Sequence, residues 1–440
     1  MPIHHYRNRG LMKLVLHSTL LAKVNQARGE PTKTDFADVH NLDAMSLPRL
    51  RRDFLDHFAM ICSTSKKGAE SATAVCLELH TSNAVLRIAR NLGMSSADLT
   101  ALEQIIEELR VVARKEKHSR EAEASILGMV VDLDADRIVS LVHKIERQGS
   151  VQSIQQATPR LSTQDRAGTL VSDVDFRLWI QRTPFGATFG SQPSAERLKA
   201  LVIWASEARS RFSRHLETFL GYRRPRPPSW LEDMHKLGRY HVAVRLMIKL
   251  AIRDAPSFRS IRIETIKPPP QETFAAPKTK TLLRDELQRL FGEESGALLG
   301  VLKERWVTGD AESYFKNACP LKLCLHAEMQ MLDFYTLNPK CLPSQRFMGI
   351  SKKACFLCHE FLLRHPQKFQ VSACHQKLYN NWMPPPCYEK SQVWTFNNHV
   401  KKITMSELKT DLKSPPRPMG KDSTAGPSMT TAATILTSNL

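Results

Sequence analysis

The amino-acid sequence predicts an α/β protein in two parts, a mostly helical N-terminal region and a smaller C-terminal sheet with helical connections. Three observations lead to this prediction. Apolar residues recur with helical spacing through most of the first 255 residues. From residue 320 to residue 373, strand-like and helix-like segments alternate, which is typical of a sheet whose strands are joined by helices. Seven of the nine cysteines fall between Cys319 and Cys387, and this clustering indicates metal ligation rather than disulfides.

The N-terminal region contains one segment with especially clear periodicity. Between Ala97 and Lys115 the apolar residues recur on one helical face, and Ser95 or Ser96 can cap the start of the helix. Similar patterns predict helices over Leu47 to Cys62, Thr73 to Leu92, Ala122 to Glu146, Ala195 to Tyr222 and Trp230 to Ile252. No part of this region has catalytic spacing.

A proline-rich connector begins at Pro268 and separates the two parts of the chain. Just before it, Ile261 and Ile263 alternate with polar residues and predict a short strand, and residues 281–305 predict a further amphipathic helix. We therefore divide the chain into a helical region, a C-terminal domain and a disordered tail rich in Pro, Ser, Thr and Gly. The three parts are residues 1–255, 256–400 and 414–440.

The chain is strongly basic, with 63 Lys and Arg against 44 Asp and Glu and a formal net charge of +19. Such an excess predicts a polyanionic partner, and nucleic acid is the usual one. The densest patch runs from Arg209 to Arg226 and interleaves arginines with aromatic residues, as single-strand-binding surfaces do. The alternative is that the patch is only the solvated face of a helix and loop.

We expect no association with membranes, because no apolar run approaches the roughly 20 residues that a spanning helix needs. The apolar stretch from Leu11 to Val24 is interrupted by charged residues and lacks a convincing cleavage site for a secretory signal. The expected location is therefore intracellular, cytoplasmic or nuclear, and not secreted.

Chemistry-bearing residues lie at the two strand-to-helix junctions of the C-terminal part. One strand-like segment leads directly into His326 and Glu328 at the start of a helical pattern, and the next leads into Cys355 and Cys358 at the start of another. The three strand candidates are residues 321–325, 347–351 and 369–373. Side chains at such junctions converge at one end of a sheet.

These four residues predict a catalytic zinc site. Cys355 and Cys358 are three apart in the first turn of a helix, so both thiolates can reach one metal ion, and the helix N-terminus favours their negative charge. His326 supplies a neutral nitrogen, and three protein ligands leave the fourth tetrahedral position open. Glu328 is two residues from a ligand and can act as a proton shuttle without binding zinc itself.

The window resembles the cytidine-deaminase-like superfamily, whose zinc signature is HxE followed by PCxxC, although Ala354 replaces the proline here. The wider context is similar to the fungal nucleic acid/nucleotide deaminases, the OTT-like group. The segments that carry this similarity are Gly349-Ile350-Ser351-Lys352, His375-Gln376-Lys377-Leu378-Tyr379, and Trp382 with Pro384. The resemblance implies a deaminase-like α/β/α sandwich with a mixed sheet, catalytic Zn²⁺, and hydrolytic deamination of cytosine or adenine.

The expected partner is nucleic acid, with single strands favoured because a base inside a duplex must first be extruded, or else a nucleotide. Lys352, His375, Tyr379 and Trp382 are candidate substrate contacts. Each has an alternative structural role: Lys352 on the surface, His375 as a hydrogen-bonded structural histidine, and the two aromatic residues in the core.

The main alternative is a closed structural zinc site in a non-enzymatic nucleic-acid-binding protein. Six further residues could complete a four-ligand set with Cys355 and Cys358, namely Cys319, Cys324, Cys341, Cys374, His375 and Cys387. Glu328 favours catalysis, because a structural site needs no carboxylate beside its ligand. A third hypothesis, an inactive scaffold with the same fold, is disfavoured because all four chemical roles are filled.

Overall fold

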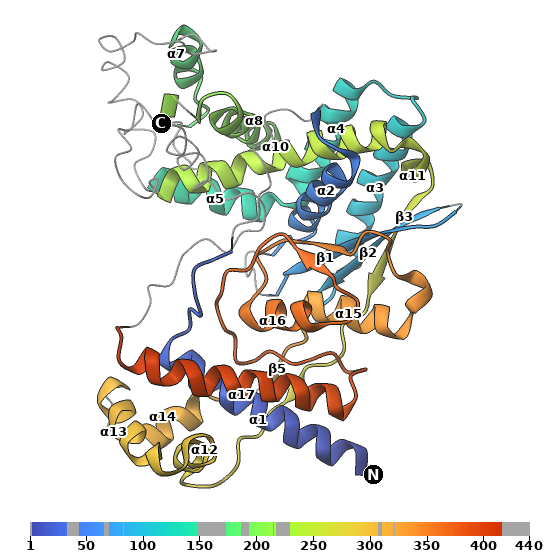
Figure 1. The fold of residues 1–440 in the computed structure, drawn as a ribbon. Helices are drawn as coiled ribbons and strands as arrows, with labels where there is room; N and C mark the ends of the chain where they lie inside the picture. The colour runs from blue at the N-terminus through green and yellow to red at the C-terminus, as the bar shows by residue number, and fades with distance from the viewer. Residues whose placement is uncertain are drawn as a thin grey trace, which may run out of the picture.

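The computed structural model describes residues 2–32, 44–65, 70–81, 83–147, 173–185, 193–213, 215–216, 229–306, 310–320 and 322–415. Within these residues the protein is α/β, with a mixed sheet enclosed by helices (Figure 1). The predicted tail from residue 416 onward, residues 148–172, and the arginines at positions 223, 224 and 226 lie outside the described residues.

The main sheet has five strands in the order β3-β2-β1-β6-β7. β1 is antiparallel to both of its neighbours, whereas β2 pairs with β3 and β6 pairs with β7 in parallel. The strands are β1 (Thr73–Leu79), β2 (Ala84–Arg90), β3 (Ile261–Ile266), β6 (Phe347–Ile350) and β7 (Gln370–Val371). A separate two-stranded sheet joins β4 (Glu272–Thr273) to β5 (Lys322–Leu323).

Helices cover both faces of the main sheet and form two hydrophobic cores. Alternate residues of β1 point into different cores: Val75 and Leu77 pack with the helices from α2 to α11, and Ala74 and Cys76 pack with α1 and the C-terminal helices. The first group comprises α2 (Leu47–Ile61), α3 (Ser96–Ala113), α4 (Ser119–Leu133), α5 (Ala135–Arg147), α7 (Asp173–Gln181), α8 (Ala195–Ser210), α10 (Ser229–Arg253) and α11 (Ala255–Arg259).

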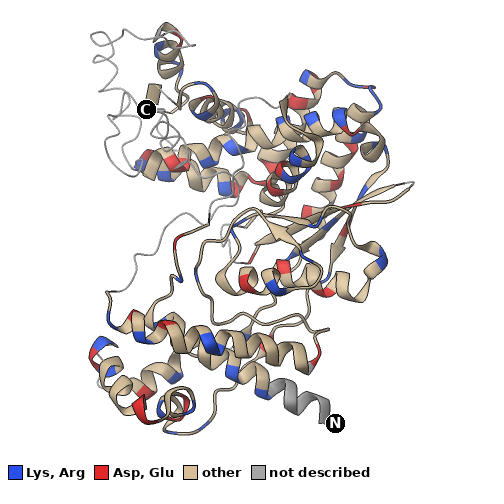
Figure 2. Cartoon of the chain, in the orientation of Figure 1, with Lys and Arg blue, Asp and Glu red and all other residues tan. Residues whose placement is uncertain are grey.

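On the opposite face α15 (Ala327–Leu337) and α16 (Phe356–Arg364) lie directly against the sheet (Figure 1). Beyond them α1 (Pro2–Val24) and α17 (Lys390–Leu412) pack side by side, although they come from opposite ends of the chain. The remaining helices of this group are α12 (Leu282–Phe291), α13 (Ser295–Trp306) and α14 (Ala311–Ala318). Figure 2 shows Lys and Arg on elements of all these groups rather than on one face alone.

The prediction of a helix from Thr73 to Leu92 is wrong, because this segment forms the β1–β2 hairpin. Both strands are buried on both faces, so their apolar residues form continuous runs without the alternation that identifies a half-buried strand. At the turn, the His80 N–H donates to the Asn83 carbonyl at 2.9 Å. The sheet therefore includes strands from both sides of the predicted boundary at residue 255.

Two other predicted helices are divided in the structure. The helix predicted from Ala122 to Glu146 is interrupted at Asp134, between α4 and α5. The helix predicted over residues 281–305 is broken at Gly292, whose φ of 58° lies in the left-handed region that glycine adopts without strain. The strand predicted over residues 321–325 is also shorter and pairs with β4 instead of joining the main sheet.

Several sequence-based predictions are confirmed. α2, α3 and α10 form where the apolar periodicity predicts them, and the Ser95 hydroxyl accepts the Asp98 N–H at the start of α3. β3, β6 and β7 also form within or across their predicted segments.

Among the described residues, no helix combines the length and apolar character needed to cross a membrane.

Candidate metal centre and active-site cavity

The end of β2 positions the start of α15, where the histidine and the glutamate lie. His326 has extended backbone (φ −65°, ψ 153°) and directly precedes the first helical residue. The next N–H, of Ala327, donates to Oδ1 of Asn91 at 2.8 Å. The side-chain amide of Gln330 donates to the carbonyls of Leu325 and Arg90 at 2.9 and 3.2 Å. The β1–β2 hairpin therefore aligns the HxE segment with the sheet.

The start of α16 is anchored on its other side by the loop that follows β7. The Ala354 N–H donates to the Ala373 carbonyl at 2.9 Å, and the Ala354 carbonyl accepts the His375 N–H at 3.0 Å. Cys355 caps the helix, and its sulfur accepts the Cys358 N–H at 3.4 Å. Both cysteines are consequently held in the first turn, as their spacing predicts.

Gly349 and Ser351 connect β6 to the rest of the sheet. A Cβ atom added at Gly349 would overlap the backbone of Leu55, so glycine allows α2 to pack directly on β6. The Ser351 hydroxyl accepts the Thr73 N–H at 2.9 Å, and the Ser351 N–H donates to the Thr73 carbonyl at 3.0 Å. This pairing with the start of β1 fixes the loop that leads to the cysteines.

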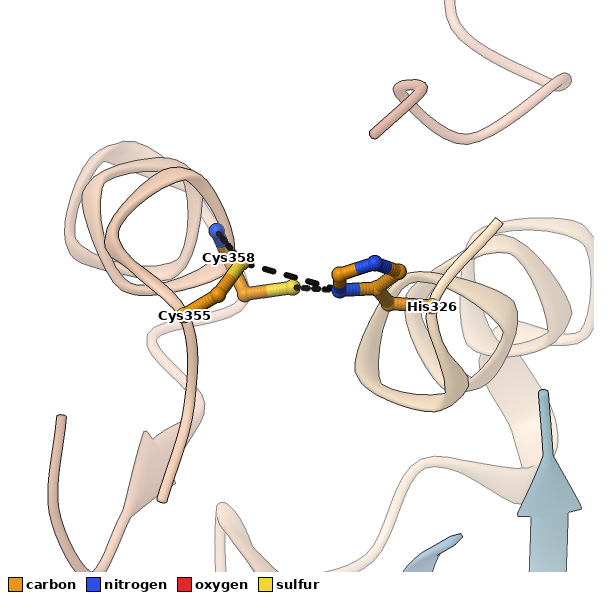
Figure 3. A group of neighbouring side chains, drawn as sticks. All are labelled: His326, Cys355 and Cys358. Carbon is orange, nitrogen blue, oxygen red and sulfur yellow. Dashed lines mark hydrogen bonds between the residues drawn. The ribbon is translucent and has the colours of Figure 1, made fainter. Parts of the chain in front are cut away.

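His326, Cys355 and Cys358 converge on one point (Figure 3). Nδ1 of His326 lies 3.6 Å from Sγ of Cys355 and 3.4 Å from Sγ of Cys358. A tetrahedral zinc ion with ordinary Zn–S and Zn–N bond lengths of about 2.3 and 2.0–2.1 Å would separate a sulfur from a nitrogen ligand by about 3.5 Å. The three donor atoms therefore have both the chemistry and the spacing of a zinc site.

The protonation states of the two cysteines also favour a cation. Burial acts to raise the pKa of Cys355, but hydrogen bonding with Cys358 and the charge of His326 lower it well below its ordinary value. Burial and the neighbouring Cys355 raise the pKa of Cys358. Only one thiolate is thus stabilised by the protein alone, and a divalent cation would stabilise both.

A closed, four-ligand structural site does not form within the described part of the chain. No other His, Cys, Asp or Glu among those residues joins the group of His326, Cys355 and Cys358. The six alternative ligands, Cys319, Cys324, Cys341, Cys374, His375 and Cys387, all lie outside it. The geometry therefore favours an open centre with three protein ligands.

Glu328 occupies the first turn of α15 and is buried, with 8% of its surface exposed. Burial raises its pKa above the ordinary value, although His326 acts to lower it. Glu328 lines a cavity of about 250 Å³ together with two of the candidate ligands, His326 and Cys355. Cys358 does not line this cavity. A carboxyl group with a raised pKa beside a metal centre is suited to accepting and returning a proton.

Three of the four predicted substrate contacts line this cavity, namely Lys352, His375 and Tyr379. Nδ1 of His375 accepts the Lys377 N–H at 2.9 Å, so the neutral ring carries its proton on Nε2 and is a hydrogen-bond donor there. Burial lowers the pKa of His375 to about 4, which keeps the ring neutral. Burial also lowers the pKa of Lys352 to about 8.

The structure does not bring the fourth predicted substrate contact, Trp382, to the cavity. Its side chain is 1% exposed, does not line the cavity, and packs against Phe361 and Phe396 with ring centroids 5.7 and 5.5 Å away. Its Nε1–H instead donates to Sγ of Cys358 at 3.3 Å. An indole buried behind the thiolate cannot stack on a base, but it can orient and stabilise a metal ligand.

Other cavity residues could not be identified from the sequence. Glu70, Asn91 and Gln271 come from segments far from the HxE and CxxC motifs, and they reach the cavity only because the β1–β2 hairpin and β3 join the sheet. Lys353 and Asn381 also line it. For these residues the sequence offered one signal, which is that Lys353 directly follows the predicted substrate contact Lys352.

The comparisons with known proteins agree with this geometry over one segment. Residues 325–386 match a family model described as OTT_1508_deam-like deaminase. Residues 325–386 form a deaminase-like domain. The match includes the histidine, the glutamate and both cysteines of the candidate centre in this domain. No curated protein and no solved structure matches the chain.

Proposed function

We propose that this protein is a zinc-dependent hydrolytic deaminase of the OTT-like group of fungal deaminases, acting on cytosine or adenine. The observation that carries the proposal is the open His326–Cys355–Cys358 centre, which shares a cavity with Glu328 inside the deaminase-like domain. Zinc, when bound there, would make water a nucleophile near neutral pH. The expected intracellular location, cytoplasmic or nuclear, belongs to the same proposal.

In the proposed reaction one water molecule enters and one ammonia molecule leaves. Glu328 accepts a proton from the water as its oxygen bonds to the ring carbon that bears the amine, and donates that proton to the adjacent ring nitrogen. The second water proton is transferred through Glu328 to the leaving amine as the carbon–nitrogen bond breaks. The raised pKa of Glu328 supports both halves of this transfer, because the carboxyl group is protonated and deprotonated within one turnover.

The other cavity residues support a base linked to phosphate. His375 directs a donor nitrogen toward an acceptor on the ring or sugar, and Tyr379 places its ring 5.7 Å from His375 and 6.2 Å from His326. Lys352 and Lys353 add positive charge to the lining, against one carboxylate besides Glu328, that of Glu70. Phosphate recognition by lysine favours a nucleotide or nucleic acid over a free base.

The decisive experiment measures ammonia release by the zinc-loaded protein on four substrate classes: nucleosides, nucleotides, single-stranded DNA and single-stranded RNA. Mass spectrometry of the products distinguishes conversion of cytosine to uracil from conversion of adenine to hypoxanthine. We expect turnover of at least one phosphate-bearing substrate. If zinc is bound stoichiometrically and none of these substrates releases ammonia, the proposed function is wrong.

A further inference from the structure

A second cavity, of about 530 Å³, lies between the C-terminal end of α16 and the N-terminal half of α17. It shares no residue with the metal cavity and is about twice as large. We call it the α16–α17 groove. Its lining includes Phe361, Arg364, Tyr388, Trp394 and Lys402. An opening of this size falls within the range of ligand-binding pockets, which is roughly 300–1,000 Å³.

The wall of the groove is aromatic. The ring of Phe361 lies 5.0 Å from Tyr388 and 4.9 Å from Phe396, both in edge-to-face arrangements. Trp394, which also lines the groove, has 61% of its surface exposed. This large aromatic ring beside the cavity is accessible for another molecule to stack on.

The charge of the lining is positive. Arg364 and Lys402 line the groove, and none of its lining residues is acidic. Glu360, just outside it, bonds both Arg364 and His399 at 2.8 Å and offsets part of that charge. Lys402 is exposed and has no carboxylate within ion-pair distance among the described residues. The groove therefore suits an anionic partner.

We propose that the α16–α17 groove binds a segment of single-stranded nucleic acid, with a base stacked on Trp394 and the backbone phosphates near Lys402 and Arg364. An aromatic platform beside cations is the arrangement that binds single strands irrespective of sequence. A second copy of this chain is disfavoured because each copy carries a net charge of +19. The chain's own residues 416–440 are disfavoured because they contain Arg417 and Lys421 against Asp422 alone.

The test uses the full chain and single-stranded oligonucleotides that contain 5-iodouracil, which cross-links under light to an aromatic ring stacked on it. Trypsin cleaves after Lys390 and Lys401, so residues 391–401 form one peptide that contains Trp394. We expect mass spectrometry to find the cross-linked nucleotide on this peptide at Trp394. Cross-links confined to other peptides would contradict the proposal.

Binding measurements test the same proposal independently of cross-linking. Trp394→Ala should weaken binding of a labelled single strand by about tenfold or more, the effect of one stacked base, whereas Trp394→Phe should retain most of the affinity. Lys402→Ala should reduce the slope of log affinity against log salt by about 0.7. Matched controls are Leu337→Ala, an exposed leucine outside the groove, and Lys340→Ala, an exposed lysine outside it.

Two results would overturn this inference. One is unchanged affinity in Trp394→Ala. The other is an oligomer that Trp394→Ala converts to monomers in sedimentation, which would make the groove an interface between copies. Neither depends on turnover: the Glu328→Gln variant should cross-link at Trp394 as the unmodified protein does. A failure to detect deamination would therefore leave the groove's assignment intact.

Discussion

The indole Nε1–H of Trp382 donates a hydrogen bond to the sulfur of Cys358 at 3.3 Å, from behind the candidate metal centre. The donor stabilises negative charge on that sulfur and acts to lower the pKa of the thiol, against burial and the neighbouring Cys355, which raise it. Hydrogen bonds of this kind from outside the ligand set commonly contribute to metal affinity and to ligand orientation.

Replacing Trp382 with Phe should therefore weaken zinc binding by about 10- to 100-fold, because the ring packing against Phe361 and Phe396 is kept while the donor is lost. The measurement is competition for zinc against a chelator of known affinity. Equal zinc affinities in the variant and the unmodified protein would show that the hydrogen bond has no effect on the metal.

The ligand assignment is tested by Cys355→Ser. Losing one of three protein ligands should reduce the zinc content, measured by elemental analysis, from about one per chain to a small fraction. The matched control is Cys324→Ser, because Cys324 also lines the cavity but does not belong to the ligand group. Undiminished zinc in Cys355→Ser would assign the metal to other residues.

Glu328→Gln separates catalysis from metal binding. The amide keeps the size of the side chain but cannot transfer a proton, so deaminase activity should fall by about 100- to 10,000-fold. Zinc content and melting temperature should stay close to those of the unmodified protein. Full activity of this variant on a verified substrate would contradict the role given to Glu328.

We expect Lys352 to make the binding of a phosphate-bearing substrate dependent on pH. Burial, with smaller contributions from Arg137 and Lys377, lowers the pKa of its ammonium group to about 8, so the charge is present below that pH and is lost above it. The affinity for a phosphate-bearing substrate should therefore fall by about tenfold between pH 7 and pH 9, as one charged hydrogen bond is lost.

Two controls identify the group responsible for that pH dependence. Lys352→Arg keeps its charge at pH 9, so this variant should lose the pH dependence. Binding of an uncharged nucleoside to the unmodified protein should change little over the same range. If the affinity for a nucleotide is constant across this range, Lys352 does not contact the phosphate.

The arginines between residues 209 and 226 stay a prediction of the sequence, because Arg223, Arg224 and Arg226 lie outside the described residues. Replacing these three with Ala should weaken binding to single-stranded DNA or RNA irrespective of sequence. The slope of log affinity against log salt should become less steep by about 2, since each phosphate contact contributes about 0.7.

A triple replacement of exposed basic residues elsewhere, Arg120, Lys144 and Lys340, has the same change in net charge and serves as the control. If residues 209–226 form a specific binding patch, replacing Arg223, Arg224 and Arg226 should reduce the affinity for single strands more than the control replacement does. Equal losses would mean that the affinity follows the net charge alone, and that residues 209–226 are a solvated surface.

The sequence by itself determined the four residues of the candidate centre, because their chemistry depends on short spacings. Cys355 and Cys358 share one helical turn, and His326 and Glu328 lie at the start of another, so the backbone geometry of a helix start brings each pair together wherever the helix is placed. Local periodicity also predicted α3, because this helix buries a single face.

Only the tertiary structure decided which distant segments complete the site. β1 and β2 are buried on both faces, so their sequence lacks the alternation of a strand, and pairing with β3 and β6 is what makes them strands. That pairing brings Asn91 to the start of α15. Trp382 lies behind Cys358 because the core around Phe361 buries it, and the burial of a side chain follows from packing between distant segments rather than from local spacing.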